Sequence, residues 1–229
     1  MVRWILFFLL IGAGLLVFFW SARDAAPDST PPLSEVAAPA SESPLPTVTG
    51  EGDQSGRGFV WPLENASERV IKKMFGTFIT PETSPVQPER FRGYHTGADF
   101  ETFPEEAETD VVIRAVCTGP VAVKRTASGY GGVLVQRCTY ENEPITVIYG
   151  HMRLASIVSA IGDSITAGDT IGVLGTGDSA ETDGERKHLH LSIHKGAGID
   201  IRGYVASQSL LDQWLDPCQL LNLAGACSL

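Results

Sequence analysis

The stretch Val133-Leu-Val-Gln-Arg-Cys-Thr-Tyr-Glu-Asn-Glu-Pro-Ile-Thr-Val-Ile-Tyr149 holds two apolar runs separated by a polar segment. Both runs, 133–135 and 145–149, are short and rich in β-branched residues, which favour strands. The segment Glu141-Asn-Glu143 between them is typical of a turn. The stretch therefore predicts a β-hairpin.

Similar runs recur on both sides of this hairpin, and Gly and Asp interrupt them at short intervals. They span residues 111–116, 121–123, 171–174 and 189–193. With a second turn expected at 129–132, the pattern predicts an all-β, mainly antiparallel sheet or sandwich.

Helix is expected to be a minor component of this fold. Asn65 is a potential cap for a short helix that runs to Phe75, before Gly76. A second short helix is expected over 207–215, ended by Pro217.

The N-terminal part of the chain differs in composition from the rest. Residues 4–20 carry no charge, and an apolar helix of this length just spans a bilayer. Such a segment is a membrane anchor or a secretory signal. The small residues of a cleavage site are missing after it, so we expect a retained membrane anchor, or an uncleaved signal, over residues 1–23. Residues 24–57, rich in Pro, Ser and Ala, predict a disordered linker, and residues 58–229 predict one folded domain. We therefore expect a single-pass membrane protein with its domain on the periplasmic or extracellular side.

All four cysteines lie in the expected domain. An even number of cysteines behind an export segment predicts disulfides in an oxidising compartment. Cys117 and Cys138 flank the turn at 129–132 and suit a cross-strand disulfide, and a Cys218–Cys227 bridge would close the C-terminus.

The charge balance bears on the partners of the chain. It has 27 acidic and 17 basic residues, which disfavours a nucleic-acid partner. The acidic residues at positions 105, 106, 108, 181, 183 and 185 are interpreted as solvated loop residues and are assigned no chemistry.

Four of the five histidines, with one aspartate, fall into three short clusters. These clusters are His95-Thr-Gly-Ala-Asp99, Tyr149-Gly-His151 and His188-Leu-His190. Side chains two or four residues apart in a strand point to one face, so His95 with Asp99, and His188 with His190, could each converge on one ion. Imidazole and carboxylate suit zinc. A catalytic zinc takes three protein ligands, which leaves two of these groups for proton transfer and charge stabilisation.

Simpler interpretations stand beside this one. A single histidine is more often a hydrogen-bonded structural residue, and spacing does not say which member of His188-Leu-His190 would bind metal. His194 shares their face but is interpreted as a residue at the end of the strand.

In order along the chain, the three clusters, with Gly129-Tyr-Gly131 and Gly162-Asp-Ser-Ile-Thr-Ala-Gly168, resemble the lysostaphin/LytM-type zinc endopeptidases. The resemblance covers about residues 58–196. It implies a duplicated-hybrid-motif β fold, built as an open barrel or sandwich. It also implies hydrolysis of the peptide cross-links of bacterial peptidoglycan, with the peptide stems as substrate.

Carried over residue by residue, the resemblance implies one Zn²⁺ held by His95, Asp99 and His190. It makes His151 and His188 the catalytic pair. The chain departs from the family over 176–187, which is longer than usual and lacks the common Gly-Pro before the first histidine. Substrate preference is therefore open at this loop.

Two other functions compete with this interpretation. Inactive relatives of such enzymes act as adaptors that regulate a cell-wall hydrolase, although they have usually lost metal or catalytic residues that are all present here. A lipoyl- or biotinyl-carrier hairpin at 162–168 is the other, but no Met-Lys-Met-like attachment site accompanies it. The need for a protein activator stays open.

Overall fold

The computed structural model describes residues 58–223 and Cys227. The predicted membrane anchor, 1–23, and the predicted linker, 24–57, lie outside the described residues. Within the described part of the chain, no helix is long and apolar enough to cross a membrane.

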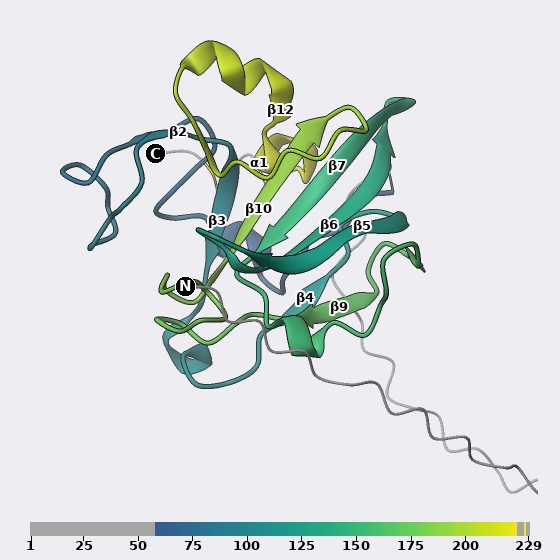
Figure 1. The fold of residues 1–229 in the computed structure, drawn as a ribbon, viewed down its shortest axis with the longest axis horizontal. Coiled ribbons are helices and arrows are strands. Elements are labelled where there is room, and N and C mark those ends of the chain that lie inside the picture. The colour runs from purple at the N-terminus through teal and green to yellow at the C-terminus, as the bar shows by residue number, and fades with distance from the viewer. Residues whose placement is uncertain (1–57, 224–226, 228–229) are drawn as a thin grey trace, which may run out of the picture. The chain divides into compact units, whose positions relative to one another are not determined.

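The domain is built on one large antiparallel sheet (Figure 1). Its strands, in spatial order, are β12 (Trp214–Leu215), β10 (His188–Lys195), β7 (Glu143–Gly150), β6 (Gly131–Tyr140), β5 (Gly119–Ala127) and β8 (Ser164–Ile165). One further strand, β3 (Gly97–Glu101), pairs with the first half of β10 on the edge where β12 pairs with its last residues.

Two smaller antiparallel sheets accompany the large one. The first contains β1 (Phe78–Ile79), β2 (Gly93–His95) and β11 (Tyr204–Val205), and the second contains β4 (Val112–Arg114) and β9 (Thr170–Val173). The prediction of a mainly antiparallel all-β fold is confirmed. The described strands form open sheets and no closed barrel.

Alternation along β10 decides which side chains face the core. Leu189, Leu191 and Ile193 are fully buried and belong to the main hydrophobic cluster. Because successive side chains of a strand point to opposite faces, His188 and His190 are directed to the other face of the sheet.

Both predicted hairpin turns are present. Strand β5 turns into β6 through residues 128–130, and β6 turns into β7 through Glu141 and Asn142 alone. The φ angles of these two residues are 52° and 68°, as a two-residue hairpin turn of the I′ class requires.

The predicted helix from Asn65 to Phe75 is wrong, because only a 3₁₀ turn, Ala66–Glu68, forms there. Asn65 has a left-handed φ of 52° and makes no side-chain cap. The carbonyls of Arg69 and Lys73 accept hydrogen bonds from the backbone amides of Glu101 and Asp99, at 2.9 and 3.0 Å. The segment therefore lies along the free edge of β3, which uses the carbonyls that a continuing helix would need.

The second predicted helix is correct in part. A 3₁₀ helix spans Gln208–Gln213, but Trp214 and Leu215 leave it to pair with β10. Pro217 begins the helix α1 (Pro217–Leu220) instead of ending the earlier one, and the Asp216 side chain caps it by accepting from the amide of Cys218 at 2.9 Å. The remaining 3₁₀ turns are Pro104–Glu106 and Leu154–Ser156.

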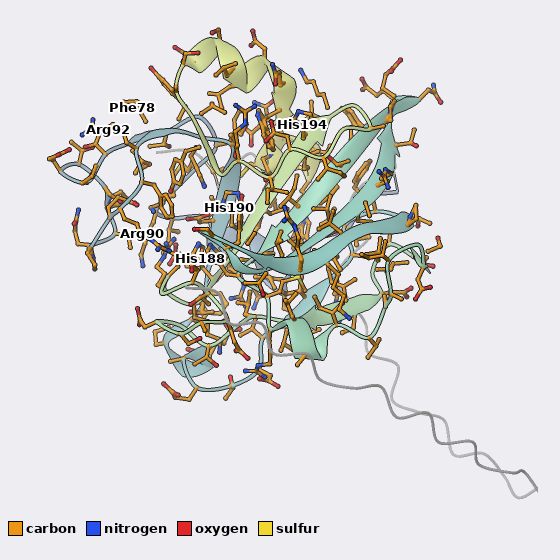
Figure 2. All side chains as sticks on the ribbon, viewed as in Figure 1. Phe78, Arg90, Arg92, His188, His190 and His194 are labelled. Carbon is orange, nitrogen blue, oxygen red and sulfur yellow. A yellow bond between two sulfur atoms is a disulfide. The ribbon has the colours of Figure 1, made fainter. Side chains whose placement is uncertain are left out.

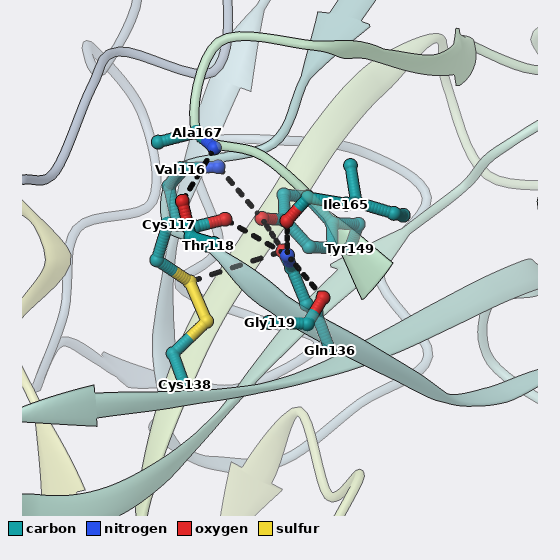
Figure 3. Close-up of a disulfide and its surroundings, with 9 residues drawn as sticks. All are labelled: Val116, Cys117, Thr118, Gly119, Gln136, Cys138, Tyr149, Ile165 and Ala167. Atoms are coloured by element: carbon teal, nitrogen blue, oxygen red, sulfur yellow. Dashed lines mark hydrogen bonds between the residues drawn. A yellow bond between two sulfur atoms is a disulfide. The ribbon is translucent and has the colours of Figure 1, made fainter. Parts of the chain in front are cut away.

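Both expected disulfides are present, Cys117–Cys138 and Cys218–Cys227. Figure 3 shows the first beside a buried polar group built on Gln136. The Gln136 amide donates to the carbonyls of Cys117 and Gly119, at 2.8 and 3.1 Å, and its oxygen accepts from the Tyr149 hydroxyl at 3.0 Å. The bridge and this network join β6 and β7 to the segment that precedes β5.

Candidate metal centre

Strand register places the first two clusters beside the third. In the ladder between β3 and β10, Asp99 lies opposite His190. On the other side of β10, His190 lies opposite Gly150 of β7. His95 ends β2 and is separated from the start of β3 by Thr96 alone, and His151 follows β7 directly. Three segments far apart in sequence thus meet at one level of the sheet.

Three atoms from these segments converge on one point. The Nε2 atom of His95 is 3.0 Å from the Nδ1 atom of His190 and 3.3 Å from Oδ1 of Asp99. The Nδ1 atom of His190 is also 3.0 Å from Oδ1 of Asp99. All three side chains are buried, and among the described residues they form the group of ligating side chains close enough to share an ion.

The donor set fits zinc, because two imidazole nitrogens and one carboxylate oxygen leave a fourth position open. The environment of His95 supports the fit. Its Nδ1 atom lies 3.2 Å from the carbonyl oxygen of Met74, which can only accept, so Nδ1 carries the proton and Nε2 presents its lone pair.

The charge states of these side chains also suit a cation. Burial would raise the pKa of Asp99, but the neighbouring His188 and His95 hold that pKa well below its ordinary value, so the carboxyl is ionised. Burial lowers the pKa of His190 to about 4, although Asp99 opposes the shift. His190 is therefore neutral near pH 7, which is the form of histidine that binds metals.

The other two histidines form a second pair beside this group. The rings of His151 and His188 have centroids 4.3 Å apart. The Nδ1 atom of His188 donates to the Arg186 carbonyl at 2.9 Å, and its Nε2 atom lies 3.3 Å from Oδ2 of Asp99. Burial, and then the charges of His188 and His190, hold the pKa of His151 well below its ordinary value. His151 is thus a neutral, buried imidazole.

The backbone at His151 is unusual and sets the direction of its side chain. Its φ angle is 61°, in the left-handed region that non-glycine residues rarely occupy and that costs on the order of 1–3 kcal/mol. The preceding residue, Gly150, has no side chain because a Cβ there would overlap the ring of Tyr130 and lie 3.2 Å from Cβ of His190. The sequence Gly150-His151 therefore lets β7 end against Tyr130 and turn a histidine toward the site.

A cavity of about 440 Å³ opens over the site. It is lined by Asp99, His151, His188 and His190, and its aromatic wall is formed by Phe91, Tyr130 and Tyr204. The rings of Phe91 and Tyr204 stack with centroids 5.3 Å apart, and the Tyr204 ring lies 5.2 Å from that of His95. An apolar wall beside convergent polar groups is the usual form of a small-molecule or peptide site.

Comparison with known proteins places this arrangement in a family. Residues 93–201 match the model described as Peptidase family M23, and all five site residues lie within that range. This region belongs to peptidase family M23. The resemblance to lysostaphin/LytM-type peptidases, predicted from the motifs, is thereby confirmed.

Individual relatives of the M23 region are distant. Endolysin 2638A of Staphylococcus phage 2638A is 28% identical over 123 residues, which are 53% of this chain and 24% of that protein. The chain thus spans about a quarter of the length of this curated relative. The solved catalytic domain of lysostaphin from Staphylococcus simulans is 18% identical, with 65% of this chain and 89% of that chain covered and a TM-score of 0.44. The structure of cbpa from L. salivarius REN is 22% identical, with 73% and 97% covered and a TM-score of 0.47.

The M23 region contains all five histidine and aspartate residues that the sequence singled out, and the structure brings them together. Figure 2 shows His188 and His190 close together, with His194 apart from them. The ring of His194 packs against Trp214, with centroids 4.8 Å apart, as expected of a residue at the end of a strand.

Some residues of the M23 site were missed in the sequence. Tyr204 and Phe91 line the cavity but belong to no motif, whereas Tyr130 lies in the quoted Gly129-Tyr-Gly131. The interpretation of the acidic loop residues as simply solvated is wrong for several of them. Four are paired with arginines that anchor their loops: Glu106 with Arg69, Glu181 with Arg153, and both Asp183 and Glu185 with Arg90.

Proposed function

We propose that this chain is a zinc-dependent endopeptidase that hydrolyses peptide cross-links of bacterial peptidoglycan. The observation that carries the proposal is the convergence of His95 Nε2, Asp99 Oδ1 and His190 Nδ1 beside the His151–His188 pair, in an open cavity. Membership of peptidase family M23 supports amide hydrolysis, and the match to a protein named as an endolysin supports the cell wall as substrate.

The proposed roles follow from the state of each side chain. His95, Asp99 and His190 hold the ion, which when bound lowers the pKa of a water molecule and polarises the scissile carbonyl. His188 acts as the base through Nε2, because its Nδ1 proton is engaged by the Arg186 carbonyl. Neutral His151, buried and with no hydrogen-bond partner for Nδ1 among the described residues, orients the water or stabilises the developing oxyanion.

We also propose that the domain acts outside a membrane to which residues 1–23 anchor it. The two disulfides support an oxidising compartment. The linker over 24–57 would then act as the tether that lets the domain reach the peptide stems.

Mass spectrometry of muropeptides released from purified peptidoglycan tests this function, because it reports whether a bond is cut and which one. Incubation with the full chain and zinc is expected to release new amino termini within the peptide stems. Incubation with a chelator is the control and is expected to release none. Release that is equal with and without the chelator would refute a metal-dependent reaction. No release in either case would favour the adaptor function.

A further inference from the structure

Arg186 lies beside the proposed metal centre and pairs with one of its ligands, Asp99. It lies at the end of the 176–187 loop, two residues before His188, and its side chain is only 17% exposed. Its Nη2 atom donates to Oδ2 of Asp99 at 3.0 Å and also to Oε1 of Glu101. Its Nε atom donates to Oε2 of Glu101 at 3.0 Å. One guanidinium therefore spans two carboxylates that lie two residues apart on β3.

The two oxygens of Asp99 consequently have different neighbours. Oδ1 faces the nitrogens of His95 and His190, at 3.3 and 3.0 Å. Oδ2 accepts from Arg186 at 3.0 Å and lies 3.3 Å from Nε2 of His188. A carboxylate held in this way offers a single oxygen to an ion, because the second is already engaged by a charged donor.

The backbone of Arg186 reaches the second half of the site. Its carbonyl oxygen accepts from Nδ1 of His188 at 2.9 Å, which fixes both the tautomer and the plane of that ring. The same residue thus contacts a ligand through its side chain and a proposed base through its backbone.

The other cations of this region cannot replace it. Lys72, whose side chain is 40% exposed, reaches Glu101 at 3.0 Å but makes no ion pair with Asp99. The ammonium of Lys187 donates instead to the backbone carbonyls of Glu106, Ala107 and Thr109. Among the described residues, Arg186 is the lysine or arginine that pairs with Asp99.

We propose that Arg186 is the positioning residue of this metal centre, holding Asp99 so that only Oδ1 faces the ion and holding His188 in one orientation. The inference rests on the proposed function, since it assigns a role toward the ion that His95, Asp99 and His190 would bind. It also gives a role to the loop in which the sequence departs from the common Gly-Pro pattern.

Zinc affinity, measured by competition with a chromophoric chelator, tests the role of the side chain. In the full chain, Arg186→Gln is expected to weaken zinc binding by about 10- to 100-fold, as loss of a partner of a metal ligand does. The cobalt-substituted variant is expected to show an altered visible spectrum, because the freed Oδ2 enters the coordination sphere. Arg186→Lys keeps the charge without the fork and is also expected to bind more weakly than the parent chain.

Arg90→Gln is the matched control, because Arg90 anchors the same loop through Asp183 and Glu185 without an ion pair to Asp99. It is expected to keep the parent affinity and cobalt spectrum. Equal losses in Arg90→Gln and Arg186→Gln would overturn the inference, since loosening of the loop would then explain both.

The double variant Arg186→Gln/Glu101→Gln separates positioning from stability. It removes the charge of Glu101, which in Arg186→Gln keeps only the partly exposed Lys72 as an ionic partner, so its melting temperature is expected to rise toward that of the parent while its zinc affinity stays weak. Recovery of affinity in the double variant, or full affinity in Arg186→Gln, would overturn the inference alone. A parent chain that binds no zinc would instead refute the proposed function, and the inference with it.

Discussion

His190 lies directly opposite Asp99 in the antiparallel ladder between β10 and β3, and its Nδ1 atom is 3.0 Å from Oδ1 of that carboxylate. Backbone register alone therefore aligns two of the three proposed ligands. The third, His95, comes from the strand that immediately precedes β3. All three proposed ligands therefore lie on strands.

Substitutions of the ligand and catalytic histidines are expected to differ in their effects on zinc content and turnover. His190→Ala removes a metal-binding nitrogen, so zinc and turnover are both lost. His151→Ala leaves the three ligands intact, so zinc content is unchanged while kcat falls by about 10²- to 10⁴-fold. Metal analysis of the purified variants, together with a muropeptide release assay, checks both expectations.

His194→Gln is the control for these variants, because His194 lies on the same strand but packs against Trp214 away from the site. It is expected to keep zinc and activity. Undiminished wall digestion by His190→Ala or His151→Ala would contradict the assigned roles.

Metal removal is expected to lower thermal stability as well as activity. An ion that binds only the folded chain stabilises it by about 4 kcal/mol when present at about 1,000 times its dissociation constant. Melting temperatures of the chelated and zinc-restored chain measure the effect. His190→Ala should show no such shift, and a similar shift in that variant would indicate a different zinc site.

Gly150→Ala is expected to destabilise the domain by about 1–3 kcal/mol, because its Cβ would overlap the ring of Tyr130. Gly198→Ala is the matched control. A Cβ at Gly198 meets no atom within 4 Å, and a change within about 0.5 kcal/mol is expected. Denaturant unfolding measures both, and equal effects would show that Gly150 is not selected by this contact.

Stability toward acid is expected to depend on Glu89. Its carboxylate pairs with Lys73 at 2.5 Å, and the two side chains are 1% and 2% exposed. Burial would raise the pKa of Glu89, but Lys73 and the amide of Phe91 hold it below its ordinary value of 4.5. Because the folded pKa is the lower one, this contribution is complete above about pH 4.5 and is lost as the pH falls through the folded pKa.

Glu89→Gln should therefore flatten the decline of unfolding free energy below about pH 4.5. At pH 7 it should cost about 3–5 kcal/mol, since Lys73 is left buried and unpaired. Glu82→Gln breaks the exposed pair with Arg92 and is expected to leave the curve unchanged. Urea titrations between pH 3 and pH 7 make the comparison. If the unfolding free energy of Glu89→Gln falls with pH in parallel with that of the parent chain, Glu89 does not contribute to the acid dependence.

The sequence predicted those parts of the fold that depend on local pattern. The apolar runs around Glu141 and Asn142 predict the hairpin, because the residues that form the turn are adjacent. The helix expected after Asn65 does not form, because the strand that pairs with its carbonyls lies far along the chain. The carbonyls of Arg69 and Lys73 pair with β3, about 30 residues further on, and no local propensity records that pairing.

The candidate site shows the same division. The spacing in His188-Leu-His190 places both rings on one face, but it does not distinguish the residue that joins His95 and Asp99 in the ligand group from the residue that lies beside His151. Arg186 could not be singled out, because its role depends on the pairing of β10 with β3. In the sequence it is one basic residue beside an acidic loop.

The pairing of β3 with β10 also has a consequence for biogenesis. Asp99 and His190 are 91 positions apart, and six strands, β4 to β9, lie between β3 and β10 in the chain. During synthesis, β3 leaves the ribosome long before β10. A nascent chain therefore has no assembled site until β10 docks, so the peptidase chemistry that we propose would be absent from incomplete chains.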